Sequence, residues 1–162
     1  MREILFRGRR VDNGEWVEGI FYQHPLTKEC FVGVHDYNNY SIAYMGNLGC
    51  PVFNKVDPTT VGQYTGLKDK NGKWIFEGDI LSFPDTGEDG YEYKEGYDFT
   101  NVATVCWNNG RWELGDYGDY NSGVMEDMDV SHCDFVATFP ESEVIGNIHD
   151  TPELPEKEDD HA

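Results

Sequence analysis

Apolar and polar residues alternate in short runs along most of this chain, and turn-forming residues separate the runs. Alternation with a period of two is typical of strands that bury one face. The runs cover residues 3–11, 15–22, 29–35, 40–44, 52–56, 64–67, 74–76, 79–83, 101–107, 111–114, 135–139 and 144–148. The pattern therefore predicts a mainly β protein with very little helix.

Three Asn-Gly pairs predict tight hairpin turns between neighbouring runs. They are Asn13-Gly14, Asn71-Gly72 and Asn109-Gly110. Both residues of such a pair tolerate a positive φ, so we expect two-residue turns. Gly66 and Gly146 interrupt β-prone runs, which indicates a bulge or a turn at Gly66 and a bulge or a barrel corner at Gly146. A single helical turn is expected after Asp57, which would cap it, with proline at its first position.

The central stretch carries a family resemblance. It reads Gln63-Tyr64-Thr65-Gly66-Leu67-Lys68-Asp69-Lys70-Asn71-Gly72-Lys73, followed by Glu77-Gly78-Asp79-Ile80. This stretch resembles the signature of the YopX family of phage and prophage proteins. Two further matches are Met1-Arg2-Glu3-Ile4-Leu5-Phe6-Arg7-Gly8 and Val144-Ile145-Gly146-Asn147-Ile148, the latter followed by Pro152-Glu153-Leu154.

The resemblance implies a phage or prophage origin, formation of a homo-oligomer, and a carboxyl-terminal domain of the Src-homology-3-type small β-barrel class. It brings no assigned activity and no catalytic residues. The expected architecture is an antiparallel β unit over residues 1–62, the small β-barrel over 63–150, and an acidic disordered tail over 151–162. Five or more short strands from residue 79 onward also suit a small, partly open barrel.

Charge is distributed unevenly along the chain. Residues 1–82 contain nine basic and ten acidic side chains, whereas residues 83–162 contain three basic and 21 acidic ones. An acidic half repels a phosphate backbone, which disfavours broad nucleic-acid binding. The alternatives are an acidic surface that serves solubility and one that meets a basic partner.

Two acidic loops rich in tyrosine are the candidate partner-binding sites. Tyrosine offers a large contact area at low entropic cost, which suits interfaces. The candidate residues are Asp85, Glu88, Asp89, Tyr91, Tyr93, Asp116, Tyr117, Asp119 and Tyr120. The leading hypothesis is a non-enzymatic accessory protein that binds another protein of unknown identity through these loops. The alternative is that the tyrosines only cap the loops.

Basic residues support a second hypothesis, in which nucleic-acid phosphates bind the amino-terminal hairpin and the central hairpin. The candidates are Arg7, Arg9, Arg10, Lys68, Lys70 and Lys73. The simpler interpretation is that the arginines lie on a solvated strand face and pair with Glu15 and Glu18 across the turn, and that the lysines and Asp69 are solvated at a hairpin tip.

A hydrolase is the third and least favoured hypothesis. Its carboxylates would be Asp79, Asp85, Glu88 and Asp89, and its base His132. Cys30, Cys50, Cys106 and Cys133 form no Cys-x-x-Cys pair, and the histidines complete no zinc spacing, so neither a metal nor a cofactor is expected. We expect reduced thiols in a bacterial cytoplasm, since neither a secretory signal nor a membrane span is evident.

Overall fold

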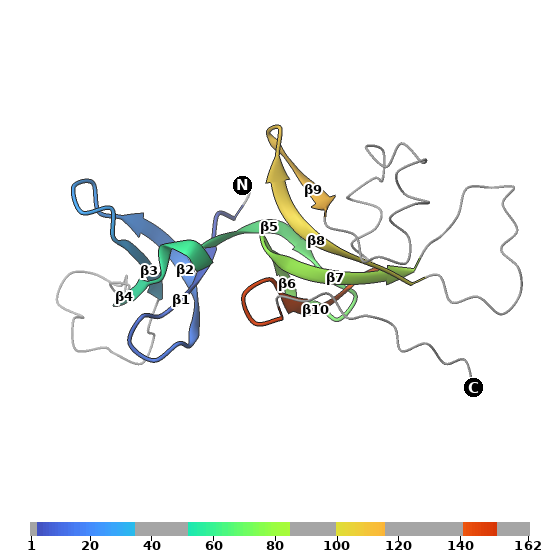
Figure 1. Cartoon of the computed structure of the whole chain (residues 1–162), viewed down its shortest axis with the longest axis horizontal. Coiled ribbons are helices and arrows are strands. Elements are labelled where there is room, and N and C mark those ends of the chain that lie inside the picture. The colour runs from blue at the N-terminus through green and yellow to red at the C-terminus, as the bar shows by residue number, and fades with distance from the viewer. Residues whose placement is uncertain (1–2, 35–51, 85–99, 116–140, 152–162) are drawn as a thin grey trace, which may run out of the picture. The chain divides into compact units, whose positions relative to one another are not determined.

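The structure is a computed structural model that describes residues 3–34, 52–84, 100–115 and 141–151 (Figure 1). The chain divides into two compact units, Met1–Gly66 and Leu67–Ala162. Apart from the short 3-10 helix η2 (Pro58–Thr60) and a 3-10 position at Glu141, the regular structure of the described residues is all β-strand. The prediction of a mainly β protein with very little helix is confirmed.

The strands form two antiparallel sheets. The first has the order β4-β3-β2-β1-β5-β6 and the second the order β10-β7-β8-β9. The boundary between the units falls inside β5. The strands are β1 (Phe6–Arg9), β2 (Trp16–Gln23), β3 (Cys30–Val34), β4 (Val52–Val56), β5 (Gly62–Lys68), β6 (Trp74–Phe76), β7 (Asp79–Pro84), β8 (Thr100–Asn108), β9 (Arg111–Gly115) and β10 (Glu143–Asn147).

The first unit buries one face of β1 to β4. Cys30, Val32 and Val56 are buried in its centre, and Val17 and Phe21 pack against them. An isolated bridge between Arg10 and Val56 links the end of β4 back to the end of β1. The Val11 N–H also donates to the Lys55 carbonyl at 3.1 Å. These bonds curl the strands around the Val32 core.

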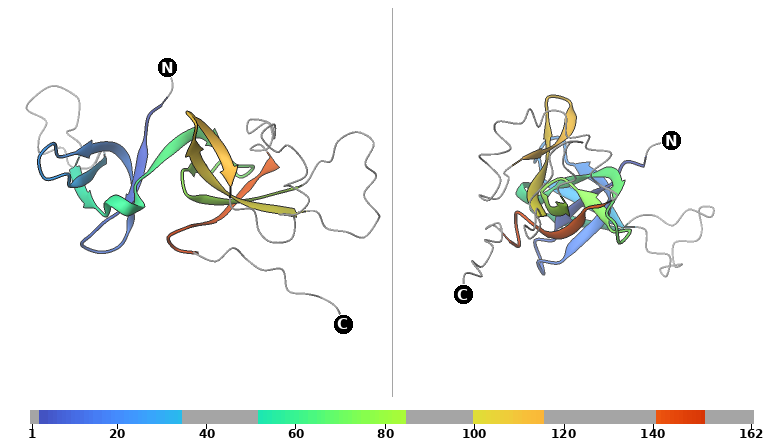
Figure 2. Two further views of the ribbon diagram at one scale, coloured as in Figure 1. Left: turned by 45° about the horizontal axis from the view of Figure 1, so that its top comes forward. Right: turned by 90° about the vertical axis from the view of Figure 1, so that its right-hand side faces the viewer.

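The second unit has its own core, built from β6, β7, β8 and β10. Ile75, Leu81, Phe83, Ala103, Val105 and Val144 are buried there. Leu81 pairs with Ala103, so both side chains lie on one face of the β7–β8 ladder, as the period of two requires. Leu67, Trp112 and Leu114 pack against this core. Figure 2 shows β8 and β9 as a strongly twisted two-stranded ribbon.

The hairpins follow the predicted positions, but two of the three predicted two-residue turns are longer loops. In the β1–β2 hairpin, Asn13 has no positive φ, and an Arg10 N–H to Glu15 carbonyl bond at 2.9 Å encloses a four-residue loop, 11–14. Asn109 and Gly110 have φ of 49° and 82°, which makes the expected two-residue turn. In the β5–β6 hairpin, Gly72 has φ of 79° but Asn71 has no positive φ. A Gly72 N–H to Asp69 carbonyl bond and an Asp69 N–H to Lys73 carbonyl bond, both 2.9 Å, enclose a three-residue loop instead. The two-residue prediction was wrong here because the Asp69 side chain holds the loop from inside.

Two further local predictions, at Gly146 and at Asp57, are confirmed. The register shifts between Val144 and Gly146, which confirms the predicted bulge. Asp57 caps the short η2 helix as expected. Over the described residues, neither sheet closes into a barrel. The predicted strands 40–44 and 135–139 lie outside the described residues, as does almost all of the predicted tail.

Candidate functional site

The outer side of the first unit carries a group of aromatic and apolar side chains. Tyr22 of β2 pairs with Phe31 of β3, and Gly33 pairs with both Ile20 of β2 and Phe53 of β4. Paired residues share a sheet face, and Val32 of the core lies between Phe31 and Gly33, so this group faces away from the core. We call Ile20, Tyr22, Phe31 and Phe53 the aromatic face.

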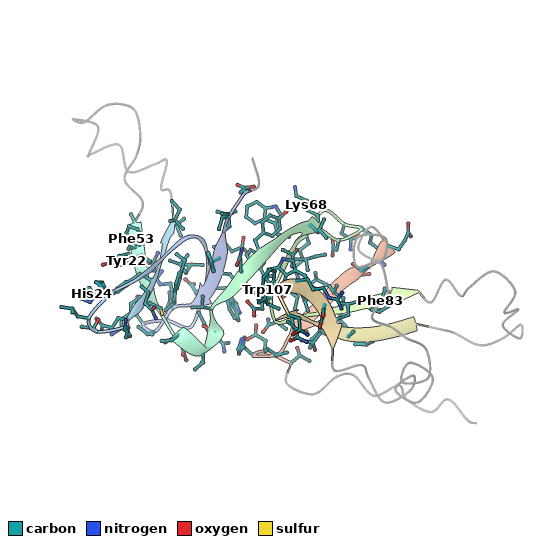
Figure 3. The ribbon with its side chains drawn as sticks, turned by 90° about the horizontal axis from the view of Figure 1, so that it is seen from above. Tyr22, His24, Phe53, Lys68, Phe83 and Trp107 are labelled. Carbon is teal, nitrogen blue, oxygen red and sulfur yellow. The ribbon has the colours of Figure 1, made fainter. Side chains whose placement is uncertain are left out.

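The aromatic face is ordered by ring contacts but remains open to solvent. The Tyr22 ring centroid lies 6.1 Å from those of Phe31 and Phe53, with the Phe53 ring nearly perpendicular to it. Ile20, Tyr22 and Phe53 are 44%, 46% and 47% exposed. Tyr22, Phe53 and neighbouring His24 lie together in Figure 3. A contiguous apolar surface of this kind marks an interaction site more often than scattered exposed residues do.

Gly33 makes room for Phe53 on this face. A Cβ atom at Gly33 would lie 2.8 Å from the Phe53 ring, closer than atoms can pack. The ring therefore covers the glycine backbone and reaches Tyr22 across β3. At the edge of the face, His24 packs edge-on against Tyr22 with ring centroids 6.5 Å apart. The His24 Nδ1 atom accepts the Thr27 N–H at 3.1 Å, which fixes the following turn.

The predicted basic residues of the first unit are held by neighbouring groups. Arg7 and Arg9 lie over the Trp16 ring, with their guanidinium carbons 5.1 and 5.8 Å from its centroid. Arg7 is only 8% exposed, so it does not lie on a solvated strand face as the simpler interpretation assumed. Arg9 Nε donates to the Gly14 carbonyl at 3.0 Å.

Arg10 and the three lysines complete the predicted set. Arg10 Nε donates to Asp12 at 2.9 Å, and Arg10 lies 3.9 Å from Glu15, the pairing across the turn that was expected. In the second unit, Lys70 pairs with Glu143 at 2.6 Å. Lys68 and Lys73 are exposed near the hairpin tip. The six cations thus lie in two units, and most already contact protein acceptors or rings.

Asp69 was expected to be solvated, and this prediction was wrong. Its side chain is buried, and its carboxylate accepts three backbone N–H groups. Oδ1 accepts from Asn71 at 2.8 Å and from Lys73 at 2.9 Å, while Oδ2 accepts from Val144 at 3.1 Å. An Asp two residues before an Asn-Gly pair is itself a signal for such a local turn, but the bond to β10 has no local signal.

The electrostatics of Asp69 follow from these bonds. Burial raises the pKa of the carboxyl group. The N–H donors of Val144, Lys73 and Asn71, together with the Lys73 charge, lower the pKa by more than burial raises it. The net pKa of Asp69 lies below its ordinary value. Hydrogen bonds to the charged form are the cause, because they favour the carboxylate over the acid.

Asp79 is a second carboxylate of the family signature, and it too accepts a backbone N–H group. Its side chain is 1% exposed, and Oδ2 accepts the Phe76 N–H at 2.8 Å across the β6–β7 turn. The other residues of the hydrolase hypothesis, Asp85, Glu88, Asp89 and His132, lie outside the described residues. So do all nine predicted partner-binding residues: Asp85, Glu88, Asp89, Tyr91, Tyr93, Asp116, Tyr117, Asp119 and Tyr120.

Among the described residues, no three His, Cys, Asp or Glu side chains are grouped so that they could hold a metal ion. Within the described part, Cys30 and Cys106 form no disulfide, whereas Cys50 and Cys133 lie outside it. No helix in the described ranges is long and apolar enough to span a membrane.

The fold and surface define a mainly β protein with an exposed aromatic face and a central hairpin fixed by a buried carboxylate. The family model described as YopX protein matches residues 6–156, so the chain belongs to the YopX family. The crystal structure of protein EF1440 from Enterococcus faecalis is similar at 24% identity, covering 96% of this chain and 100% of that chain, with a TM-score of 0.47. No match was found among curated proteins.

Proposed function

We propose that this YopX-family protein is a non-enzymatic accessory protein that binds another protein, and that the aromatic face forms part of the contact. The observation that supports this most is the exposure of Ile20, Tyr22 and Phe53 on the side of the sheet opposite the Val32 core. The core on the inner face stabilises the first unit. Burial in that core does not explain the outer aromatic side chains, which stay about half exposed, and a role in recognition explains their grouping.

The acidic loops of the second unit belong to the same proposal. Their carboxylates and tyrosines, which include Asp85, Tyr91, Asp116 and Tyr120, would meet a partner that is basic on at least part of its surface. Charged residues at the rim of an interface govern the association rate and its dependence on salt. Aromatic residues at its centre govern dissociation.

The test compares surface variants of the full chain. Tyr22→Ser combined with Phe53→Ser removes two exposed rings, and Leu26→Ser, at a residue 86% exposed in the nearby turn, is the matched control. Binding is first measured by quantitative pull-down from host lysate treated with nuclease, and then by calorimetry with the purified partner. We expect the double variant to lose at least about tenfold in affinity, because aromatic residues dominate such contacts. Unchanged affinity in the folded double variant would refute the aromatic face as a contact.

Deletions in the loops test the other part of the proposal. Removing residues 85–96 or 116–123 should weaken binding, and the residual affinity should depend less on salt. If both deletions bind the partner as the full chain does, at low and at high salt, the loops take no part.

Other features are proposed on the strength of the family resemblance. They are a phage or prophage origin, action in the bacterial cytoplasm, a homo-oligomeric state, and a second unit of the Src-homology-3-type small-barrel class. Sedimentation equilibrium over a range of concentrations measures the oligomeric state. A monomer at all concentrations would end that part of the proposal.

Nucleic-acid binding is the weaker alternative. Arg7 and Arg9 stack on Trp16, an arrangement that could also receive a base, but Arg7 is buried and Lys70 is paired. Such binding would weaken steeply with salt. A gel-shift assay at low salt that shows no complex with single-stranded DNA, duplex DNA or RNA would exclude it.

A further inference from the structure

The tip of the β5–β6 hairpin covers the outer edge of β10. The Lys70 N–H donates to the Ser142 carbonyl at 2.9 Å. The Val144 N–H donates to Asp69 Oδ2 at 3.1 Å. Both contacted groups flank Glu143, which pairs with Ser82 of β7 on the other side of β10. Because β10 is the last strand in its sheet, these bonds lie where a further strand would otherwise pair.

The two bonds imitate one rung of a β-ladder. In a parallel bridge, the neighbouring strand donates an N–H to the carbonyl of one residue and accepts the N–H of the residue two positions later. Lys70 supplies the N–H, and the Asp69 carboxylate takes the place of the backbone carbonyl. The ion pair between Lys70 Nζ and Glu143, at 2.6 Å, lies beside the same rung.

We propose that Asp69 and Lys70 form an edge cap, which prevents β10 from pairing with β10 of a second copy of this chain. An uncapped edge strand offers a row of backbone donors and acceptors to any other strand. The β10 edge also exposes Ile145, at 42%, next to the capped rung. Two identical edges can pair antiparallel about a twofold axis, which makes a second copy the natural occupant. This inference is independent of the proposed function, since it concerns only contacts within the second unit.

Two substitutions each break one of the two bonds of the cap, and we call them the uncapped variants. Lys70 is the second residue of the turn closed by the Gly72 N–H to Asp69 carbonyl bond, a position that favours proline. Lys70→Pro therefore suits the turn, while it removes the N–H to Ser142 and places its ring carbon against the Ser142 carbonyl. Asp69→Asn keeps an oxygen for Asn71 and Lys73 but places an amide N–H₂ group against the Val144 N–H. Lys70→Ala is the matched control, because it removes the ion pair and keeps the backbone rung.

The experiment measures the mass of the full chain by sedimentation equilibrium, and the exchange of the Val144 amide by NMR. For Asp69→Asn we expect Val144 exchange to rise about tenfold to a hundredfold, since one hydrogen bond to a charged group is lost. We expect Lys70→Pro and Asp69→Asn to associate beyond the wild-type state as concentration rises, and Lys70→Ala to match the wild type.

The inference is overturned if both uncapped variants stay folded, as shown by circular dichroism, and keep the wild-type mass at every concentration. It is also overturned if Lys70→Ala associates to the same extent, because the ion pair and not the rung would then protect the edge. If one uncapped variant fails to fold, the mass of the other variant decides whether the inference holds.

Discussion

Replacing Asp69 by alanine tests the structural account of the central hairpin most directly. The substitution removes an acceptor for three backbone N–H groups, from Asn71, Lys73 and Val144. Asn71 and Lys73 are exposed at the tip, so water can reach their N–H groups once the carboxylate is gone. Val144 is 8% exposed and part of the second core, so its N–H loses its partner with little access to water.

The expected magnitude follows from these environments. Leaving a buried N–H without a partner costs about 2 kcal/mol, and exchanging a charge-assisted bond for one to water costs about 1 kcal/mol for each tip N–H. Asp69→Ala should therefore lower the free energy of unfolding of the second unit by about 4 kcal/mol. This is a large part of the roughly 5–15 kcal/mol that holds a typical domain together. Asp69→Asn keeps two of the bonds and should cost about 2 kcal/mol.

The assay must follow the unfolding of each unit separately. Three of the four tryptophans, Trp74, Trp107 and Trp112, lie in the second unit, and Trp16 lies in the first. Urea unfolding followed through the indole N–H resonances in NMR reports both units in one sample. The transition of the three tryptophans should move to lower urea, while that of Trp16 stays in place. A loss below about 1 kcal/mol for Asp69→Ala, or an equal shift of both transitions, would show that the Asp69 carboxylate does not hold the hairpin.

The remaining predictions concern acid, packing and surface charge. The pKa of Asp69 is lower in the folded protein than in the unfolded chain. The stabilisation from its carboxylate is therefore complete above the unfolded pKa of about 4 and is lost as pH falls through the folded pKa. Urea titrations from pH 7 to pH 2 should show this loss of stability, and Asp69→Asn should abolish the share of the loss that comes from Asp69. Gly8→Ala would place a Cβ 2.9 Å from the Cβ of buried Val56, so thermal unfolding should show a loss of about 1–3 kcal/mol; unchanged stability would contradict the clash. Glu143→Gln removes an ion pair with Lys70 that is about half exposed, so the urea midpoint should shift by less than about 1 kcal/mol, and a larger shift would show that the pair matters.

Local sequence signals predicted much of this fold because strands and tight turns depend on neighbouring residues. Alternation located all ten strands of the described residues. Asn109-Gly110 specified its turn because both residues tolerate a positive φ. The family signature likewise identified the chain as a YopX protein. Even the bulge at Gly146 was evident from a glycine inside an apolar run.

The aromatic face and the edge cap depend on contacts that local patterns do not contain. Tyr22 and Phe53 were assigned to separate strands, and only the register of β2, β3 and β4 brings their rings within 6.1 Å. Asp69 appeared to be one charge among lysines, but Val144, 75 positions away, makes it a buried acceptor. The positions of strands and turns are local properties of the sequence, because φ preferences and alternation act over a few residues. The faces and edges that meet are set by the fold, because strand pairing joins residues that the chain separates.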